Sequence, residues 1–384
     1  MSWVNTTLGE ISANIQTGPF GSQLHQSDYS DEGTPVVMPK DLVNGQISEV
    51  SIARVSEDHV NRLSRHKVEV GDILYSRRGD VGRCAFATDI EQGWLCGTGC
   101  LRVTIDRSKA IPKFVFYQLQ KAETVGWVEK HAVGATMLNL NTSILSSVPI
   151  EMPPLTEQKT IVDILSAYDD LIENNQKQIK LLEEAAHRLY KEWFVNLRFP
   201  GHENTPITDG VPQGWKKISL GDIAPILTGK KDANFGTKDG AYPFFTCSQE
   251  PIRAPEYSFN TSAVILAGNG DFNVKLYRGK FEAYQRTYVL SPAEEKYLYL
   301  LYNAVSESMA VLAKGASGST IKFLTKGMIE SIPLFIPTNE LLAQYNSYSE
   351  AVQRKIECLK CAIVNATEAR DRLLPKLMSG EIEV

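Results

Sequence analysis

The chain has 384 residues, 43% of them hydrophobic, and this length allows two domains that each bury a core. The chain has no run of 18 apolar residues and no basic, apolar leader, so we expect a cytoplasmic protein that makes no membrane contact. The net charge of −5 argues against strong sequence-independent DNA binding, because such binding usually comes from an excess of Lys and Arg. If the chain contacts DNA, either its acidic residues lie on other surfaces or a partner supplies basic groups. In both cases we expect the chain alone to bind DNA weakly.

The six cysteines are irregularly spaced, which is typical of reduced thiols rather than of a disulfide framework. Cys358 and Cys361 form a CxxC pair inside a helical pattern, with no second Cys or His pair nearby. We therefore expect thiols at these positions, and not a metal site.

The first part of the chain predicts a mixed domain of short strands. Strands are predicted at residues 35–38, 72–76 and 100–105, with Gly-rich turns between them. A helix predicted at 112–121 would pack on this sheet. A Pro-bounded strand closes the domain, and one long helix follows, from about Thr156 to about Val195.

After a linker rich in Pro and Gly, the same order of elements is predicted again. Strands are predicted at 263–267 and 287–290, and a helix at 293–304 is the expected counterpart of helix 112–121. A second long helix follows. The predicted organisation is a domain at 1–155, a helix at 156–197, a linker at 198–214, a domain at 215–338 and a helix at 339–379.

The two halves are also related by a direct sequence repeat. The segment from Gly134 to Pro153 recurs from Gly318 to Pro337, a shift of 184 residues that continues into the long helices. Near the start of each half, Thr-Leu-Gly at Thr7 matches Ser-Leu-Gly at Ser219, a shift of 212 residues. The second globular part is therefore about 28 residues shorter, while its exit and its helix keep their register.

Both long helices carry seam residues at alternating steps of four and three, which predicts a heptad seam. The apolar seam positions are Ile161, Leu165, Ile172, Ile179, Leu182 and Leu189 on the first helix, and Ile356, Leu359, Ile363 and Leu373 on the second. Asn175 is a polar seam position, most simply one that sets the register. Because the linker is short, the first helix must end near the start of the second, so we predict an antiparallel pair. Helices of about 32 residues span roughly 48 Å and would act as a spacer.

Heptads alone more often indicate a coiled-coil scaffold than DNA recognition. A duplicated scaffold or adaptor that binds proteins and no DNA is therefore the competing interpretation. The sequence also lacks the phosphate-binding loop GxxxxGK[ST], the zinc motif HExxH and the nucleophile motif GxSxG. Its six histidines are scattered without metal-ligand spacing, so we predict no catalytic residues and no metal site in this chain.

Several segments resemble the specificity subunits of type I restriction-modification systems. In the first half they are Thr-Gly-Pro-Phe-Gly-Ser from Thr17, Gly-Asp-Ile-Leu from Gly71, Ser-Arg-Arg-Gly-Asp-Val-Gly-Arg from Ser76, Gly-Ala-Thr-Met-Leu-Asn-Leu-Asn from Gly134 and Pro-Pro-Leu-Thr-Glu-Gln from Pro153. The second copy is more diverged and lacks the Pro-Pro-Leu and Glu-Gln elements before its helix. The resemblance covers essentially the whole chain.

This resemblance implies an α+β fold with two homologous mixed α/β target recognition domains and an internal pseudo-twofold repeat. A two-helix antiparallel coiled coil would separate the domains. In that family each domain reads one half of a split, asymmetric DNA sequence, while the helices set the gap and dock two methyltransferase subunits. Nuclease/translocase subunits would join through the methyltransferases. S-adenosylmethionine, ATP and magnesium are expected on those partners, and no cofactor is expected in this chain.

Arginines and amides in Gly-rich turns are the predicted DNA contacts, because they grip phosphates or pair with base edges. The first-ranked residues are Arg77, Arg78 and Arg83, with Asp80 either holding a guanidinium or accepting from a cytosine. Further candidates in the first domain are Gly18, Ser22, Lys40, Thr136, Asn139 and Asn141. Turn and helix capping is the alternative role of Thr136, Asn139 and Asn141. Candidates in the second domain are Lys230, Lys231, Asn269, Lys275, Arg278, Gln285, Arg286 and Lys322.

Overall fold

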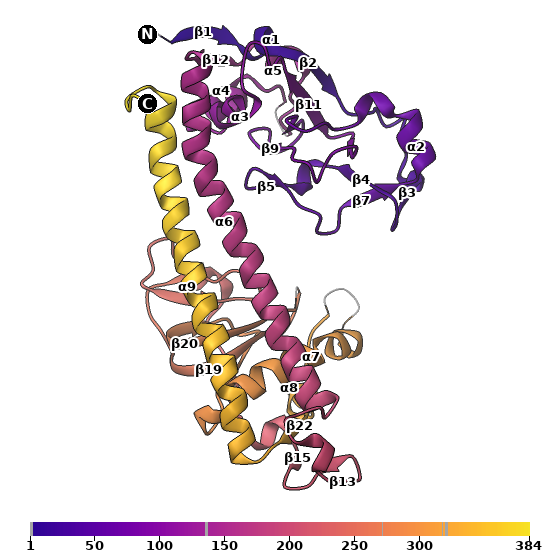
Figure 1. The fold of residues 1–384 in the computed structure, drawn as a ribbon, viewed down its shortest axis with the longest axis vertical. Helices are drawn as coiled ribbons and strands as arrows, with labels where there is room; N and C mark the ends of the chain where they lie inside the picture. Colours follow the sequence, from indigo (N-terminus) through magenta and orange to yellow (C-terminus); the bar gives the residue numbers. More distant parts are fainter. Residues whose placement is uncertain (1–2, 135–136, 271, 317, 319–321) are drawn as a thin grey trace. The chain divides into compact units, whose positions relative to one another are not determined.

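The computed structural model describes residues 3–134, 137–270, 272–316, 318 and 322–384. It forms two compact units: residues 1–173 with 363–384, and residues 174–362. The long helices α6 (Leu155–Tyr190) and α9 (Asn339–Met378) each contribute to both units. Each unit also contains its own sheets, which are shown in Figure 1.

The first unit is built around a sheet in the order β2-β11-β8-β9. These strands are β2 (Ser12–Thr17), β8 (Ile73–Ser76), β9 (Cys84–Phe86) and β11 (Cys100–Ile105). The core under this sheet includes Tyr75, Val103 and Phe114, and helix α3 (Pro112–Leu119) supplies its buried face. The remaining helices of the globular part are α1 (Leu8–Ile11), α2 (Glu57–Arg62), α4 (Ala122–His131) and α5 (Thr142–Ser146).

A second sheet in this unit has the order β10-β4-β7-β3 and its own small core. Its strands are β3 (Tyr29–Ser30), β4 (Thr34–Val37), β7 (Ala53–Val55) and β10 (Leu95–Cys96). The short strands β5 (Leu42–Val43) and β6 (Gln46–Ile47) pair with each other. The predicted strands at 35–38, 72–76 and 100–105 are therefore confirmed to within one residue at each end.

The second unit repeats the central sheet of the first with the order β16-β21-β19-β20, which is then extended by β17 and β18. These strands are β16 (Ile226–Thr228), β17 (Tyr242–Phe245), β18 (Ile252–Ala254), β19 (Phe259–Ala267), β20 (Val274–Ala283) and β21 (Thr287–Leu290). A small hairpin, β13 (Ile207–Thr208) with β14 (Val211–Pro212), lies in the linker. Strand by strand, β2, β11, β8 and β9 correspond to β16, β21, β19 and β20.

The entry and exit strands follow the two sequence shifts. Strand β1 (Val4–Thr7) pairs antiparallel with β12 (Pro149–Met152), and β15 (Lys216–Ser219) pairs in the same way with β22 (Pro333–Ile336). The shift of 212 relates β1 to β15, and the shift of 184 relates β12 to β22. Leu8 N donates to Val148 O at 2.9 Å, and the matching Leu220 N donates to Ile332 O at 2.8 Å. The two domains therefore share one topology, as the repeat predicted.

One helix differs from its prediction. The helix expected at 293–304 is α7 (Leu298–Gly315), which begins five residues later and ends well beyond the expected point. A 3-10 turn at Glu295–Tyr297 precedes it. Asn346 Nδ2 donates to the Lys296 backbone oxygen at 2.7 Å and anchors this turn to α9. A short helix, α8 (Lys326–Glu330), corresponds to α5.

The two long helices run in opposite directions, which is evident inside each unit. In the first unit, Ile161 and Leu165 near the start of α6 share a core with Leu377 and Met378 at the end of α9. In the second unit, the π-helical turn Lys191–Val195 that follows α6 meets the beginning of α9. There the Phe194 and Tyr345 rings pack edge to face, 4.8 Å apart. The predicted antiparallel arrangement is confirmed.

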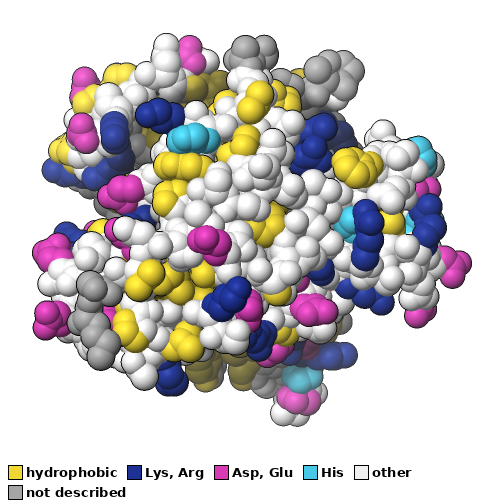
Figure 2. Space-filling model, turned by 90° about the horizontal axis from the view of Figure 1, so that it is seen from above, with side chains coloured by type: hydrophobic (Ala, Val, Ile, Leu, Met, Phe, Trp, Pro, Cys, Tyr) yellow, Lys and Arg dark blue, Asp and Glu magenta, His cyan; other side chains and the backbone are white. Residues whose placement is uncertain are grey.

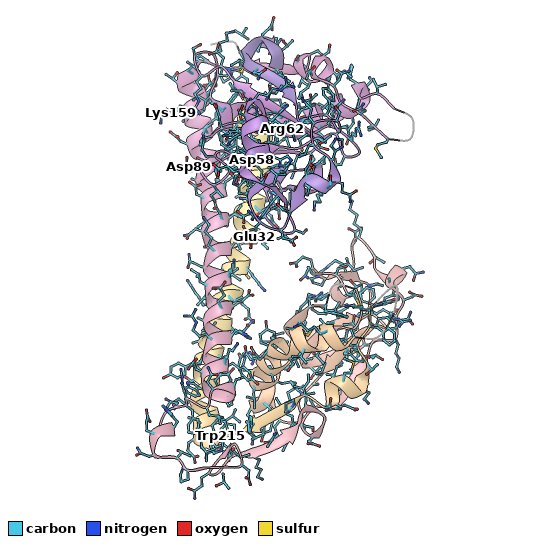
Figure 3. The ribbon with its side chains drawn as sticks, turned by 90° about the vertical axis from the view of Figure 1, so that its right-hand side faces the viewer. Glu32, Asp58, Arg62, Asp89, Lys159 and Trp215 are labelled. Carbon is cyan, nitrogen blue, oxygen red and sulfur yellow. The ribbon has the colours of Figure 1, made fainter. Side chains whose placement is uncertain are left out.

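Burial follows the predicted heptad seam on both helices. Ile161, Leu165, Ile356 and Leu359 are buried, and Ile172, Ile179, Leu182, Leu189, Ile363 and Leu373 are half-buried. The polar seam residue Asn175 is only 5% exposed, and its Nδ2 has no hydrogen-bond partner in the described part of the chain. An aromatic cluster follows the end of α6 in the second unit. It includes Trp215, which is labelled in Figure 3, and the tilted ring of Phe199, with ring centroids 4.6 Å apart.

Candidate nucleic-acid interface

In the first domain the arginine-bearing turn after β8 lies against the segment before α5. Leu140 N donates to Arg77 O at 2.8 Å, and Gly79 N donates to Leu138 O at 3.1 Å. Arg78 and Asn139 form an isolated antiparallel bridge between these segments. The fold therefore brings together Arg77, Arg78 and Asn139, which are 62 positions apart in sequence at their extremes. We call this contact between the two segments the first junction.

Two polar atoms at the first junction are buried without a partner in the described part of the chain. They are Nε of Arg77, a donor, and Oδ1 of Asn139, an acceptor. Buried polar groups are normally paired with protein or water, so atoms left over are candidates for contact with a ligand or ordered water. Arg78, in contrast, is exposed.

Asp80 holds a neighbouring guanidinium in place. Its Oδ2 accepts from Arg83 Nη2 at 2.7 Å and from Nε at 3.1 Å, a two-pronged ion pair within the same turn. This is the first of the two roles predicted for Asp80. The pair is exposed, so it contributes little to stability but limits the orientations open to Arg83.

Three other candidates in the first domain, Asn141, Gly18 and Lys40, have structural roles. The Asn141 side chain caps α5 by accepting from Ile144 N at 2.8 Å, which is its predicted alternative role. Gly18 is buried and packs against the connection between β10 and β11. A Cβ at this position would lie 1.8 Å from Gly97 O. Lys40 Nζ donates to Ser51 O at 2.7 Å, and Ser22 is exposed. Thr136 lies outside the described residues.

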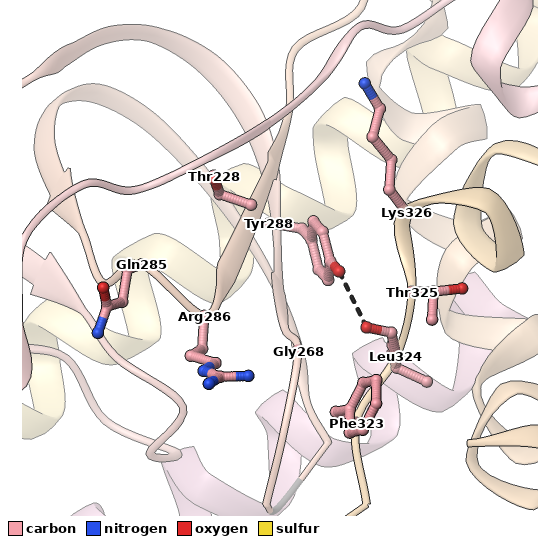
Figure 4. A pocket seen from close by; sticks show the side chains of 9 residues that line it. All are labelled: Thr228, Gly268, Gln285, Arg286, Tyr288, Phe323, Leu324, Thr325 and Lys326. Carbon is pink, nitrogen blue, oxygen red and sulfur yellow. Dashed lines mark hydrogen bonds between the residues drawn. The ribbon is translucent and has the colours of Figure 1, made fainter. Parts of the chain in front are cut away.

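In the second domain the corresponding place is a hollow of about 500 Å³, shown in Figure 4. Its lining residues come from the ends of β16, β19 and β21 and from the segment leading into α8. They are Thr228, Gly268, Gln285, Arg286, Tyr288, Phe323, Leu324, Thr325 and Lys326. Among them, Gln285 and Arg286 are predicted contacts, and both side chains are exposed.

Several other predicted residues surround this hollow. Asn269 forms a bridge with Phe323, and Gln285 N donates to Lys231 O at 3.0 Å. The Lys231 ammonium lies 4.0 Å from the centroid of the Phe235 ring, which holds it by a cation–π contact. Lys230 and Lys322 are exposed.

Two predicted contacts of the second domain lie on β20 and are engaged by other residues. Lys275 Nζ donates to Ser248 O at 2.9 Å and also to the Asn273 side chain. Arg278 Nε lies 3.5 Å from Glu295, and its guanidinium stacks over the Tyr299 ring at 5.2 Å. Arg278 therefore faces the α7 side of the sheet and does not line the hollow.

Sequence reasoning did not select Thr228, Tyr288, Phe323, Thr325 or Lys326. Aromatic residues near strand ends are usually core residues, so nothing local distinguishes Tyr288 and Phe323 as residues that line a hollow. The signal was nevertheless present, because the shift of 184 maps Asn139 onto Phe323 and Asn141 onto Thr325. Thr325 keeps the capping role of Asn141, since its hydroxyl accepts from Met328 N at 3.4 Å.

Charges of both signs occur together on one face of the molecule. On the face drawn in Figure 2, Lys and Arg side chains alternate with Asp and Glu side chains. No group of three or more His, Cys, Asp or Glu residues among those described is arranged to hold a metal ion. Over the same residues, no helix is both long enough and apolar enough to cross a membrane. All six cysteines are free thiols, and Cys358 and Cys361 are exposed on α9.

Comparison with known proteins explains the two-domain pattern. A family model described as "Type I restriction modification DNA specificity domain" matches the chain twice, over residues 2–184 and 212–348. The chain is a member of this specificity family. Each match covers one globular domain with part of its neighbouring helix, so the sequence repeat is a repeat of the family's own domain.

Related specificity subunits match different shares of the chain. The specificity subunit of the type I restriction enzyme EcoDI from Escherichia coli is 38% identical over 170 residues, which cover 44% of this chain and 36% of that protein. The MjaIX specificity subunit from Methanocaldococcus jannaschii is 26% identical over 390 aligned positions, which cover 93% of this chain and 88% of that protein. The family comprises the non-catalytic recognition components of restriction-modification systems, so the chain is not an enzyme.

A solved structure supports the fold. The crystal structure of the S subunit of a type I restriction-modification system from M. genitalium superposes with a TM-score of 0.60 at 18% identity. The superposition covers 98% of this chain and 96% of that one. At this identity the likeness establishes the fold alone.

Proposed function

We propose that this specificity subunit reads a bipartite, asymmetric DNA site, with one half-site for each globular domain. The observation that carries the proposal is the equivalence of the two domains at one place. In both, a turn that follows the third strand of the central sheet is bridged to the segment that enters a short capped helix. Arginine and amide side chains gather at both places, and these groups suit base edges and phosphates.

The two long helices serve in this proposal as the spacer and as the docking site for two methyltransferase subunits. Several large apolar side chains on them are more than two-fifths exposed and are candidates for contact with the methyltransferase subunits. They are Leu171 at 46%, Leu181 at 64%, Tyr348 at 50% and Val364 at 55%. S-adenosylmethionine, ATP and magnesium would be bound by the methyltransferase and nuclease/translocase partners, and not by this chain.

The net charge of −5 affects how the proposal must be tested. A protein with this charge gains little from counterion release and should bind DNA weakly alone. Gel-shift assays over a pool of random duplexes should therefore be run with the chain alone and with a co-expressed methyltransferase subunit. We expect sequence-selective retention only with the methyltransferase. Absence of selectivity in both conditions would favour the second candidate, a scaffold that binds proteins and no DNA.

The scaffold candidate is supported by the seam itself, whose positions are buried or half-buried along both helices. A scaffold gives no reason for both domains to gather arginine and amide side chains at the same junction. A related test is catalytic: purified chain incubated with labelled S-adenosylmethionine, or with Mg²⁺ and plasmid, should show no turnover.

A further inference from the structure

The hollow in the second domain occupies the place of the first junction. In the first domain, Arg77 N donates to Gly99 O at 2.9 Å; in the second, Gly268 N donates to Arg286 O at 2.9 Å. The same backbone positions then accept, from Leu140 N in the first domain and from Leu324 N in the second, at 2.8 Å in both. Gly268 therefore corresponds to Arg77.

The same bonds show that Arg286 corresponds to Gly99. The two domains thus exchange the arginine and the glycine across one pair of hydrogen-bonded strand ends. In the first domain the guanidinium belongs to Arg77, which directly follows β8. In the second it belongs to Arg286, which directly precedes β21. Because of this exchange, one arginine lies at the first junction and one at the hollow, but the two occupy different backbone positions.

Close packing excludes a side chain at both Gly268 and Gly99. A Cβ at Gly268 would lie 2.4 Å from Arg286 O and 2.9 Å from the Tyr288 ring. A Cβ at Gly99 would lie 2.8 Å from the Pro39 ring. No side chain fits at Gly268, so none enters the hollow from this position, and the hollow stays open. Its volume of about 500 Å³ lies within the range of sites that hold small molecules, roughly 300–1,000 Å³.

Two residues that line the hollow are held by contacts with other described residues, whereas its hydrogen-bonding side chains Arg286, Gln285 and Thr228 are not. Tyr288 Oη donates to Leu324 O at 2.9 Å, which locks the ring, and Lys326 pairs with Glu330 at 3.4 Å. Within the described part of the chain, the side chains of Arg286, Gln285 and Thr228 make no hydrogen bond or ion pair with the protein. In Figure 4 the guanidinium of Arg286 points toward the Phe323 ring, which is 37% exposed.

We propose that this hollow is the base-reading subsite of the second recognition domain, and that it takes the edge of a base pair in the DNA groove. The inference rests on the proposed function. Arg286 supplies a planar, two-pronged donor that suits guanine O6 and N7, and Gln285 supplies an amide that suits adenine N6 and N7. Phe323 and Tyr288 form the apolar wall that excludes water from these contacts. Arg77 contacts a base in the first domain. It extends from the end of β8, whereas Arg286 precedes β21, the counterpart of β11, so the two domains read different bases.

The experiment uses the full chain in complex with its methyltransferase subunits. Bound duplexes are selected from a random library and sequenced for wild type, Arg286→Lys and Gln285→Met. Arg286→Lys keeps the charge but loses the planar fork, so it separates base reading from phosphate binding. The matched control is Arg278→Lys, in the same domain but held by Glu295 outside the hollow.

We expect Arg286→Lys to lose discrimination by about tenfold or more at one or two base pairs of one half-site. The other half-site should be unchanged, and Gln285→Met should relax the same or an adjacent position. Arg278→Lys should select the wild-type motif. A wild-type bipartite motif that Arg286→Lys leaves intact, or weakens equally for all sequences, overturns the subsite but not the proposed function. A wild-type complex that selects no motif overturns both.

Discussion

Arg77 and Arg78 are neighbours on one turn, but their surroundings differ. Arg77 is half-buried with an unpartnered Nε, while Arg78 is exposed. We predict that Arg77→Ala and Arg78→Ala each weaken recognition of one half-site by about 1–3 kcal/mol and leave the other half-site unaffected. Competition gel-shifts with duplexes mutated in one half-site measure this. A uniform loss over all sequences would instead identify these arginines as phosphate clamps.

His66 gives the first domain a pH dependence. It is 1% exposed, and burial, together with the charges of Arg65 and Arg102, lowers its pKa to about 4. Below the ordinary pKa of about 6.5 the unfolded chain binds a proton that the folded chain rejects, so stability falls as the pH falls from about 6.5 to 4.

The His66 contribution should be about 2 kcal/mol of unfolding free energy lost between pH 7 and pH 5. Urea unfolding of wild type and His66→Asn at both pH values measures it. The variant should show a correspondingly smaller loss than wild type. Equal pH dependence in His66→Asn and wild type would contradict this assignment.

At the scale of elements, Asp169 of α6 joins the first domain to both long helices. Its carboxylate accepts from Tyr117 Oη of α3 at 2.6 Å and from Arg370 Nη1 of α9 at 2.9 Å. Lys113 of α3 lies 3.6 Å away. By the shift of 184, the second copy has Gln353 and Ala186 in place of Asp169 and Arg370, so it lacks this connection.

The second domain is attached to the helices by different groups. His187 and Lys191 from the end of α6 pair with Glu307 of α7, at 2.8 and 3.5 Å. Asn303 Nδ2 of α7 donates to Tyr345 Oη of α9 at 2.9 Å. The docking of the two domains is therefore conserved in topology but not in chemistry.

We predict that Asp169→Asn destabilises the chain by about 1.5–3 kcal/mol, the range for a hydrogen bond to a charged group. The substitution removes the charge that Lys113 and Arg370 share, while nearly all of the side-chain volume remains. Denaturant unfolding measures the loss, with the exposed neighbour Asp170→Asn as the control. An Asp169→Asn variant as stable as its control would show that the network contributes nothing.

The seam makes a separate prediction about assembly. Ile172 and Ile179 are half-buried, so an aspartate at either position places a carboxylate against apolar neighbours at a cost of about 2 kcal/mol. The double variant Ile172→Asp with Ile179→Asp should lose the methyltransferase or uncouple recognition of the two half-sites. Co-purification and the half-site gel-shifts measure both outcomes. Unchanged assembly would show that the seam is not an interface.

For the molecule as a whole, the repeat was the most informative part of the sequence. The shifts of 184 and 212 relate β12 to β22 and β1 to β15, and they predict the shared topology. Seam spacing and a short linker are sufficient to predict antiparallel helices, because both are local properties of the chain. The sequence shows that Arg77 and Arg78 share one turn, but their contact with Asn139, 62 positions away, is evident only from the fold.

Long-range packing accounts for what the sequence did not reveal. The hollow exists because Gly268 lies against Arg286, eighteen positions away in sequence, and the exchange with Arg77 becomes evident only from the matching hydrogen bonds. The structural role of Gly18 depends in the same way on its approach to Gly97. The start of α7 depends on an anchor from α9, which no local pattern contains.

The central claim is that one chain recognises two separate DNA half-sites through two homologous domains. Sequencing the duplexes that the chain and its methyltransferase subunits select from a random library tests this claim most directly. We expect two different enriched blocks, separated by a gap of constant length and no base preference. A single enriched block, or two blocks with a variable gap, would contradict it.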